Sequence, residues 1–164
     1  MASKKSKSKR QSAGKPEQLQ LDEFVLYLDE NLDNCQPILE TLISNSIQHR
    51  RHRDHFARGT PDEEWLQFVA AQSWVVLTKD KRNRYNEIER EALRRHKVRE
   101  FYFGSGNFNG EEMAQALEGA LAHMKALTRQ YSPPLVGSIG RSGHITIVFD
   151  EYGSTHDRRR KRHK

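Results

Sequence analysis

The chain contains a single cysteine, Cys35, among its 164 residues. One thiol forms no intrachain disulfide and supplies no paired-cysteine zinc motif. The sequence also lacks a run of about 18 apolar residues, which a membrane-spanning helix needs. No basic start leads into an apolar segment, as it does in a secretory signal. These absences exclude a disulfide-stapled domain, and we expect a cytoplasmic protein.

Two common kinds of catalytic motif are missing as well. The chain has no G-x-G-x-x-G or Walker loop, and the glycine-rich segment GSGNFNG at residues 104–110 lacks the lysine that a Walker loop uses. Ser105 does not stand in a nucleophile elbow, so a serine-hydrolase triad has no support. The chemistry must therefore come from other side chains.

Positive charge is concentrated at the two ends of the chain. Residues 1–20 and 151–164 together hold twelve Lys and Arg against three acids, a net charge of +9. Residues 21–150 hold 16 basic and 19 acidic residues, a net charge of −3. The ends are poor in apolar residues, so we expect two disordered basic tails around one globular domain of residues 21–150. Such tails either bind a phosphate backbone through counterion release or serve only solubility.

Short apolar segments alternate with helical patterns between the tails. The patterns predict strands at 24–29, 74–78 and 98–103, a weak polar strand at 47–56, and a closing hairpin at 134–149 that turns at 141–143. They predict helices at 33–47, 83–96 and 111–128, and one more that starts near residue 61. This alternation is typical of an α/β fold with three layers, in which helices cover both faces of a mostly parallel sheet.

Acidic residues follow two of these strands directly. Asp29 ends the apolar part of FVLYLDEN (24–31), and Asp80 follows the apolar part of WVVLTKDKR (74–82). Ligands of open α/β sheets bind beyond the carboxyl ends of the strands, where two such carboxylates converge. Oxygen ligands of this kind suit Mg²⁺ or Mn²⁺. An aspartate in this position is also ordinary turn or helix-cap chemistry, so the pattern leaves both interpretations open.

Two polar segments lie between those strands. GTPDEEW predicts a helix start with Thr60 as N-cap and Glu63 completing a capping box. Asp62 then falls in the first turn, where an acid complements the helix dipole without any catalytic role. The segment HRRHRDHF (49–56) is interpreted as a basic, solvated edge of the domain.

The segments YLDEN, RDHFARGTPDEEWL and WVVLTKDKRNRY, in this order, resemble the PIN-like nucleases, in particular those related to VapC-type toxins of toxin–antitoxin pairs. The resemblance extends over roughly residues 24–103. It implies that residues 21–150 form a three-layer α/β/α PIN-like domain. It further implies a metal-dependent endoribonuclease that hydrolyses RNA with the help of Mg²⁺ or Mn²⁺.

The resemblance also implies roles for individual residues. The catalytic, metal-binding acids would be Asp29, Asp62 and Asp80, with either Asp54 or Glu40 as a further ligand. Thr78 and Glu30 would orient the ligand carboxylates. Four cationic residues close to Asp80 either contact RNA phosphates or form a solvated helix start: Lys79, Lys81, Arg82 and Arg84.

The implied partners are RNA and a cognate antitoxin protein, and a homodimer stays open. Two other functions also stay open. One is a non-catalytic nucleic-acid or protein-binding module on the same fold. The other is a phospho-acceptor switch domain with Asp54 as acceptor beside the acidic pair Asp29-Glu30. Metal-dependent RNA cleavage separates the first hypothesis from both.

Overall fold

The structure, a computed structural model, describes residues 24–79, 87–104 and 107–155. Within these ranges seven strands form one sheet: β1 (Val25–Leu28), β2 (Gln48–Arg51), β3 (Val75–Thr78), β4 (Arg99–Phe103), β5 (Leu135–Ile139), β6 (Ile145–Asp150) and β7 (Gly153–Ser154). Their order in the sheet is β2-β1-β3-β4-β5-β6-β7. The strands from β2 to β5 pair in parallel, and β6 and β7 are added antiparallel. The mostly parallel sheet predicted from the sequence is confirmed.

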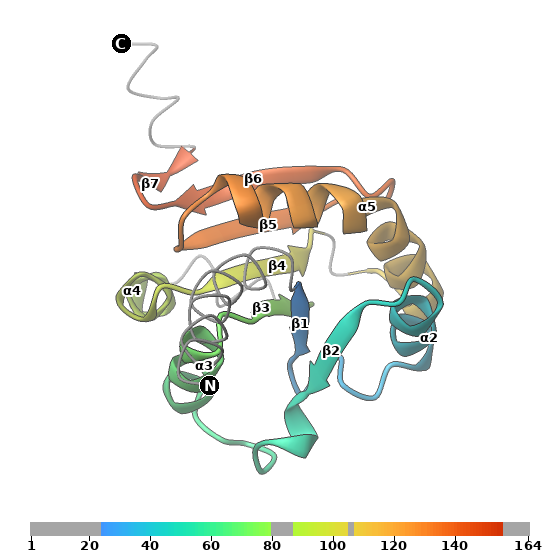
Figure 1. Ribbon diagram of the computed structural model, residues 1–164, viewed down its shortest axis with the longest axis horizontal. Helices are drawn as coiled ribbons and strands as arrows, with labels where there is room; N and C mark the ends of the chain where they lie inside the picture. The colour runs from blue at the N-terminus through green and yellow to red at the C-terminus, as the bar shows by residue number, and fades with distance from the viewer. Residues whose placement is uncertain (1–23, 80–86, 105–106, 156–164) are drawn as a thin grey trace, which may run out of the picture.

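Helices cover both faces of this sheet (Figure 1). In the described ranges they are α2 (Gln36–Ser44), α3 (Asp62–Ala71), α4 (Glu87–His96) and α5 (Gly110–Gln130), with a 3-10 helix, η1 (His52–Asp54), after β2. Helices α2 and α5 share a core with Leu26 and Leu28 of β1, and α3 and α4 share a second core with Tyr27. Successive side chains of a strand point to opposite faces, so β1 contributes to both cores. The α/β/α arrangement is therefore confirmed.

Burial on both faces explains the apolar character of the central strands. Every residue of β1 and of β3 is buried, and burying a Val or Leu side chain contributes roughly 1.5–3 kcal/mol. Strand β2, with the sequence QHRR, lies at the edge of the sheet and is only partly buried. Charged side chains on an edge strand discourage pairing with a strand of another chain. The weak polar strand expected here is present, and it forms an edge.

The predicted cap of α3 is wrong. Pro61 occupies the N-cap position, and no side chain caps the helix. The Thr60 hydroxyl instead donates to the carbonyl oxygen of Ala57 at 2.6 Å. This hydrogen bond closes the turn that precedes the helix. A complete capping box occurs at α5, which the sequence analysis missed. There the Asn109 side chain accepts from the Glu112 N–H at 2.8 Å, and the Glu112 carboxylate accepts from the Asn109 N–H at 3.1 Å.

Three of the described helices end in the same kind of turn. Ser46, Ser73 and Lys97, which follow α2, α3 and α4, have positive φ angles of 55°, 61° and 56°. In each case the next residue donates its N–H to a carbonyl five residues earlier: Ile47 to Leu42 at 2.8 Å, Trp74 to Val69 at 3.2 Å and Val98 to Leu93 at 3.0 Å. This is the Schellman motif, whose left-handed position glycine usually occupies. None of the helices in the described ranges is long and apolar enough to cross a membrane.

The left-handed position of Ser46 leads to a stability prediction. A side chain in this conformation costs about 1–2 kcal/mol, whereas glycine costs about 0.5–1 kcal/mol of extra chain entropy. Ser46→Gly is therefore expected to raise the free energy of unfolding by about 0.5–1 kcal/mol, measured by urea denaturation. Ser44→Gly, inside the last turn of α2, is the matched control and is expected to lower it by about 0.5 kcal/mol. A loss of stability in both variants would contradict the strain argument.

Candidate active site

Asp29 lies at the carboxyl end of β1, beside the end of β3. The two strands are parallel neighbours with Leu28 opposite Leu77, and the Asp29 N–H extends the pairing with a 3.4 Å hydrogen bond to the Leu77 carbonyl. Asp29 is 6% exposed and Thr78 is fully buried. The Thr78 hydroxyl donates to Oδ2 of Asp29. The hydrogen bond expected between Thr78 and a carboxylate is thus present, and Asp29 is its partner.

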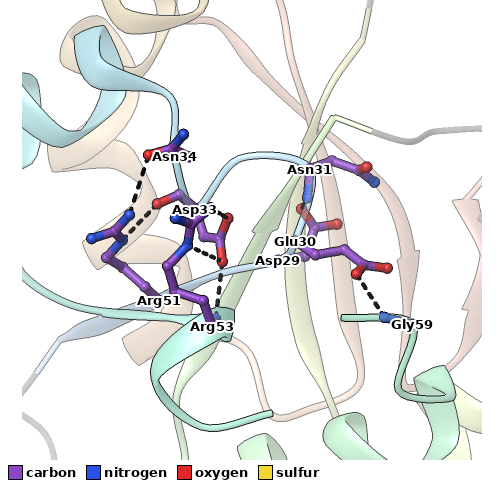
Figure 2. A network of polar contacts seen from close by, with 8 residues as sticks. All are labelled: Asp29, Glu30, Asn31, Asp33, Asn34, Arg51, Arg53 and Gly59. Carbon is purple, nitrogen blue, oxygen red and sulfur yellow. Dashed lines mark hydrogen bonds and ion pairs between the residues drawn. The ribbon is translucent and has the colours of Figure 1, made fainter. Parts of the chain in front are cut away.

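The turn after β1 fixes the same carboxylate from the other side. The Asn31 N–H donates to Oδ1 of Asp29 at 3.1 Å, and the Asp33 N–H donates to the Asp29 carbonyl at 2.9 Å. Glu30 is exposed, and its Oε2 accepts from the Gly59 N–H at 3.0 Å, as Figure 2 shows. Glu30 therefore joins the turn after β1 to the loop before α3.

An ion pair between the buried Asp33 and the half-exposed Arg53 lies beside this turn, and it was not predicted from the sequence. Asp33 is 2% exposed. Arg53 donates to it from its N–H at 2.9 Å, from Nε at 3.3 Å and from Nη2 at 3.2 Å. Arg51 Nε donates to the Asp33 carbonyl at 2.6 Å (Figure 2). A buried carboxylate needs such partners. Together the two arginines hold the turn after β1 against the edge of the sheet.

His52 is buried, which corrects the interpretation of HRRHRDHF as entirely solvated. It is 1% exposed, and its Nδ1 lies 2.5 Å from the hydroxyl of Tyr27. Trp65 stacks on Tyr27 with ring centroids 5.4 Å apart. Burial raises the pKa of the Tyr27 phenol well above its ordinary value of 10.0, and the negative charges of Asp29, Asp33 and Glu30 raise it further. The acidic turn after β1 therefore disfavours ionisation of the Tyr27 phenol.

The remaining candidate residues lie around this centre or outside the described ranges. Asp62 is the first residue of α3, and its Oδ1 accepts from Trp65 Nε1 at 3.1 Å. Asp54, in η1, and Glu40, on α2, are both exposed, as is Lys79 just after β3. Four candidates lie outside the described residues: Asp80, Lys81, Arg82 and Arg84.

The donors gathered at this end of the sheet are oxygen atoms. Asp29 and Glu30 bring carboxylates and Thr78 brings a hydroxyl, a donor set that suits Mg²⁺ or Mn²⁺ better than a thiophilic metal. Among the residues that the structure describes, no three His, Cys, Asp or Glu side chains are grouped closely enough to hold a metal ion.

Comparison with known proteins shows which family the chain resembles. A family model described as a PIN-like domain matches residues 24–105, which is 82 of the 164 residues. Neither the curated proteins nor the solved structures give a match. The matched segment contains β1 to β4 and therefore both strands that meet at Asp29.

The raised pKa of Tyr27 can be tested with Tyr27→Phe. A neutral phenol favoured by the fold adds stability that is fully present below pH 10.0 and is lost as pH rises through the folded-state pKa. The stability advantage of wild type over Tyr27→Phe in urea denaturation is therefore expected to shrink above pH 10.0. The tyrosinate absorbance of the wild type minus that of the variant should appear only above this pH. A difference spectrum centred at or below pH 10.0 would contradict the assigned environment.

Proposed function

The chain belongs to the family of PIN-like domains, and we propose that it is a metal-dependent endoribonuclease. PIN-like domains are generally nucleases. The observation that carries the proposal is the Asp29 carboxylate, which is buried at the carboxyl end of β1 and held by Thr78 of the parallel neighbour β3. A carboxylate fixed at this edge of an α/β sheet is placed where such folds bind their ligands.

The proposed metal ligands are Asp29, Asp62 and Asp80, together with Asp54 or Glu40. Asp80 follows Thr78 by two residues, which limits the separation of their Cα atoms to about 7 Å. The proposal of Asp80 as a ligand is supported by the hydrogen bond between Thr78 and Asp29. Asp54 and Glu40 are both exposed, so burial does not distinguish between them as the further ligand.

Phosphodiester hydrolysis divides the work between the metal and the chain. A bound Mg²⁺ or Mn²⁺ would lower the pKa of a water molecule and offset negative charge on the phosphate. Asp29 would hold the ion in one orientation, because Thr78 and the Asn31 N–H each fix one of its carboxylate oxygens. Lys79, exposed just after β3, would bind a flanking phosphate together with Lys81, Arg82 and Arg84.

We predict that Asp29→Asn and Asp80→Asn each lower RNA cleavage by at least about 100-fold while the protein stays folded, because the metal loses a charged ligand. The measurement is cleavage of a set of RNAs with Mn²⁺ and then with EDTA. Glu118→Gln, an exposed position on α5, is the control and should cleave normally. Full activity of Asp29→Asn would rule out its proposed role.

Asp62 allows a sharper comparison because its structural role is visible. Asp62→Asn keeps an oxygen that can accept from Trp65 Nε1, so stability should hardly change while cleavage falls. Trp65→Phe removes the donor but no charge, and it should lower stability more than activity. If Asp62→Asn lowers stability alone, Asp62 is a helix-start residue. A folded wild type that cleaves no RNA with Mn²⁺ would favour a non-catalytic binding module.

We further propose that a cognate antitoxin restrains the enzyme in the cytoplasm. An unrestrained ribonuclease would degrade the RNA of its own cell. A guanidinium from the partner would pair bidentately with the proposed metal-binding carboxylates of Asp29, Asp62 and Asp80 in place of the metal.

This mode of inhibition predicts competition with the metal. Excess Mn²⁺ should partly restore cleavage in the complex, and Asp80→Asn should weaken the complex as well as activity. The measurement is cleavage and co-purification from the native cell, with the Glu118→Gln variant as control. If expression of the protein alone is harmless and no partner co-purifies, the toxin hypothesis is overturned, and a nuclease without an antitoxin remains.

A further inference from the structure

A pocket of about 440 Å³ lies at the opposite end of the strands from Asp29. It forms where α3 and α4 end and where β3 and β4 begin, and Figure 1 shows these two helices on the same side of the sheet. Trp74, just before β3, contributes an apolar wall. Thr78 stands four residues further along, which places the pocket roughly 13 Å from the acidic end of the strand. The pocket is therefore separate from the candidate active site.

The described residues that line this pocket include cations but no carboxylate. Arg95, Lys97 and Arg99 bring three positive side chains, and His96 adds an imidazole. Glu63 does not line the pocket, but its Oε1 pairs with Arg95 Nη2 at 2.8 Å. Both partners of that pair are more than half exposed, so solvent screens it. The lining as a whole favours an anion.

Two buried nitrogen atoms of the lining have no hydrogen-bond partner among the described residues. They are His96 Nε2 and Arg99 Nε. His96 Nε2 comes no closer than 3.6 Å to Glu63, which is beyond hydrogen-bond distance. Burial also lowers the pKa of the Arg99 guanidinium, which means that the charged form is less well solvated in the pocket than in water. An oxygen-rich anion in the pocket would supply the missing acceptors.

The backbone at Lys97 allows a test of the pocket that also controls for stability. Lys97 occupies the left-handed position after α4, where its φ is 56°. Glycine fits this position best, and a long side chain here costs about 1–2 kcal/mol. A lysine at this position places a positive charge on the pocket wall at the expense of stability. Ser46 and Ser73 adopt the same conformation after α2 and α3, so it is the charge of Lys97, and not the strain, that bears on binding.

We propose that this pocket binds the phosphate monoester of a nucleotide, either as a free nucleotide or as the phosphorylated end of an RNA chain. A dianionic phosphate matches three cations, and the guanidinium groups of Arg95 and Arg99 suit its geometry. With a volume of about 440 Å³ and Trp74 in its lining, the pocket offers space and an apolar surface for the attached sugar and base. The proposal goes beyond the nuclease function and does not depend on it.

The test is isothermal titration calorimetry of the full chain with inorganic phosphate and with AMP. EDTA is present, so that metal-free carboxylates at the other end of the strands repel the anion. Lys97→Gly is expected to bind both ligands roughly tenfold more weakly, the loss of one charge-assisted contact, although the variant should be more stable than wild type. Ser46→Gly is the matched control, because it relieves the same backbone strain outside the pocket, and its affinity should equal that of wild type.

Loss of binding in Lys97→Gly therefore cannot be attributed to misfolding. Wild type that binds neither phosphate nor AMP, Lys97→Gly that binds as tightly as wild type, or an equal loss in Ser46→Gly would each overturn the proposal.

RNA oligonucleotides with a 5′-phosphate or a 5′-hydroxyl distinguish the two sources of the ligand. If the 5′-phosphate strengthens binding and AMP competes with it, the pocket holds an RNA end. If AMP binds and the 5′-phosphate adds nothing, the pocket holds a free nucleotide. Both results support the phosphate site, and both can be obtained with the Asp29→Asn variant, so failure of the nuclease proposal leaves them interpretable.

Discussion

The parallel pairing of β1 with β3 is the constraint on which the candidate site depends. β1 is buried on both faces and has a paired strand on each side, so its carboxyl end cannot shift without breaking the sheet. The ladder continues one residue past β1, through the Asp29 N–H. Asp29 and Thr78 therefore meet because of main-chain geometry. A carboxylate placed in this way is oriented before any ligand arrives.

Crowding of negative charge is the main difficulty at this end of the sheet. Asp29, Glu30 and Asp33 lie within five residues, and two of them are buried. Each has a different donor: the Thr78 hydroxyl, a main-chain N–H and the Arg53 side chain. The distribution of donors keeps the three carboxylates from competing for one partner. Their combined field is still felt by Tyr27, whose phenol they help to keep neutral.

The sequence predicts those features that depend on one element at a time. Apolar segments located the central strands. The role of Thr78 as a carboxylate partner was implied by the resemblance to PIN-like nucleases, and only the position of β3 beside β1 shows that Asp29 is that partner. The Asp33–Arg53 pair and the Tyr27–His52 contact were missed because both require that β2 lies beside β1. Composition does not reveal which polar residue of HRRHRDHF turns inward. Asp80 lies outside the described residues, so the complete ligand set stays a prediction.

The tight helix ends have a consequence for the lengths of the connections. Only residues 45–47, 72–74 and 97–98 join α2, α3 and α4 to the strands that follow, whereas the described segments after β1 and β2 are longer, at 29–35 and 52–61. One inserted residue in a short connection would send every side chain of the next strand to the wrong face. We therefore expect insertions and deletions to be tolerated mainly at the end of the sheet that carries Asp29. The loops at that end can change in length and sequence, by evolution or by design, while the strands keep their register.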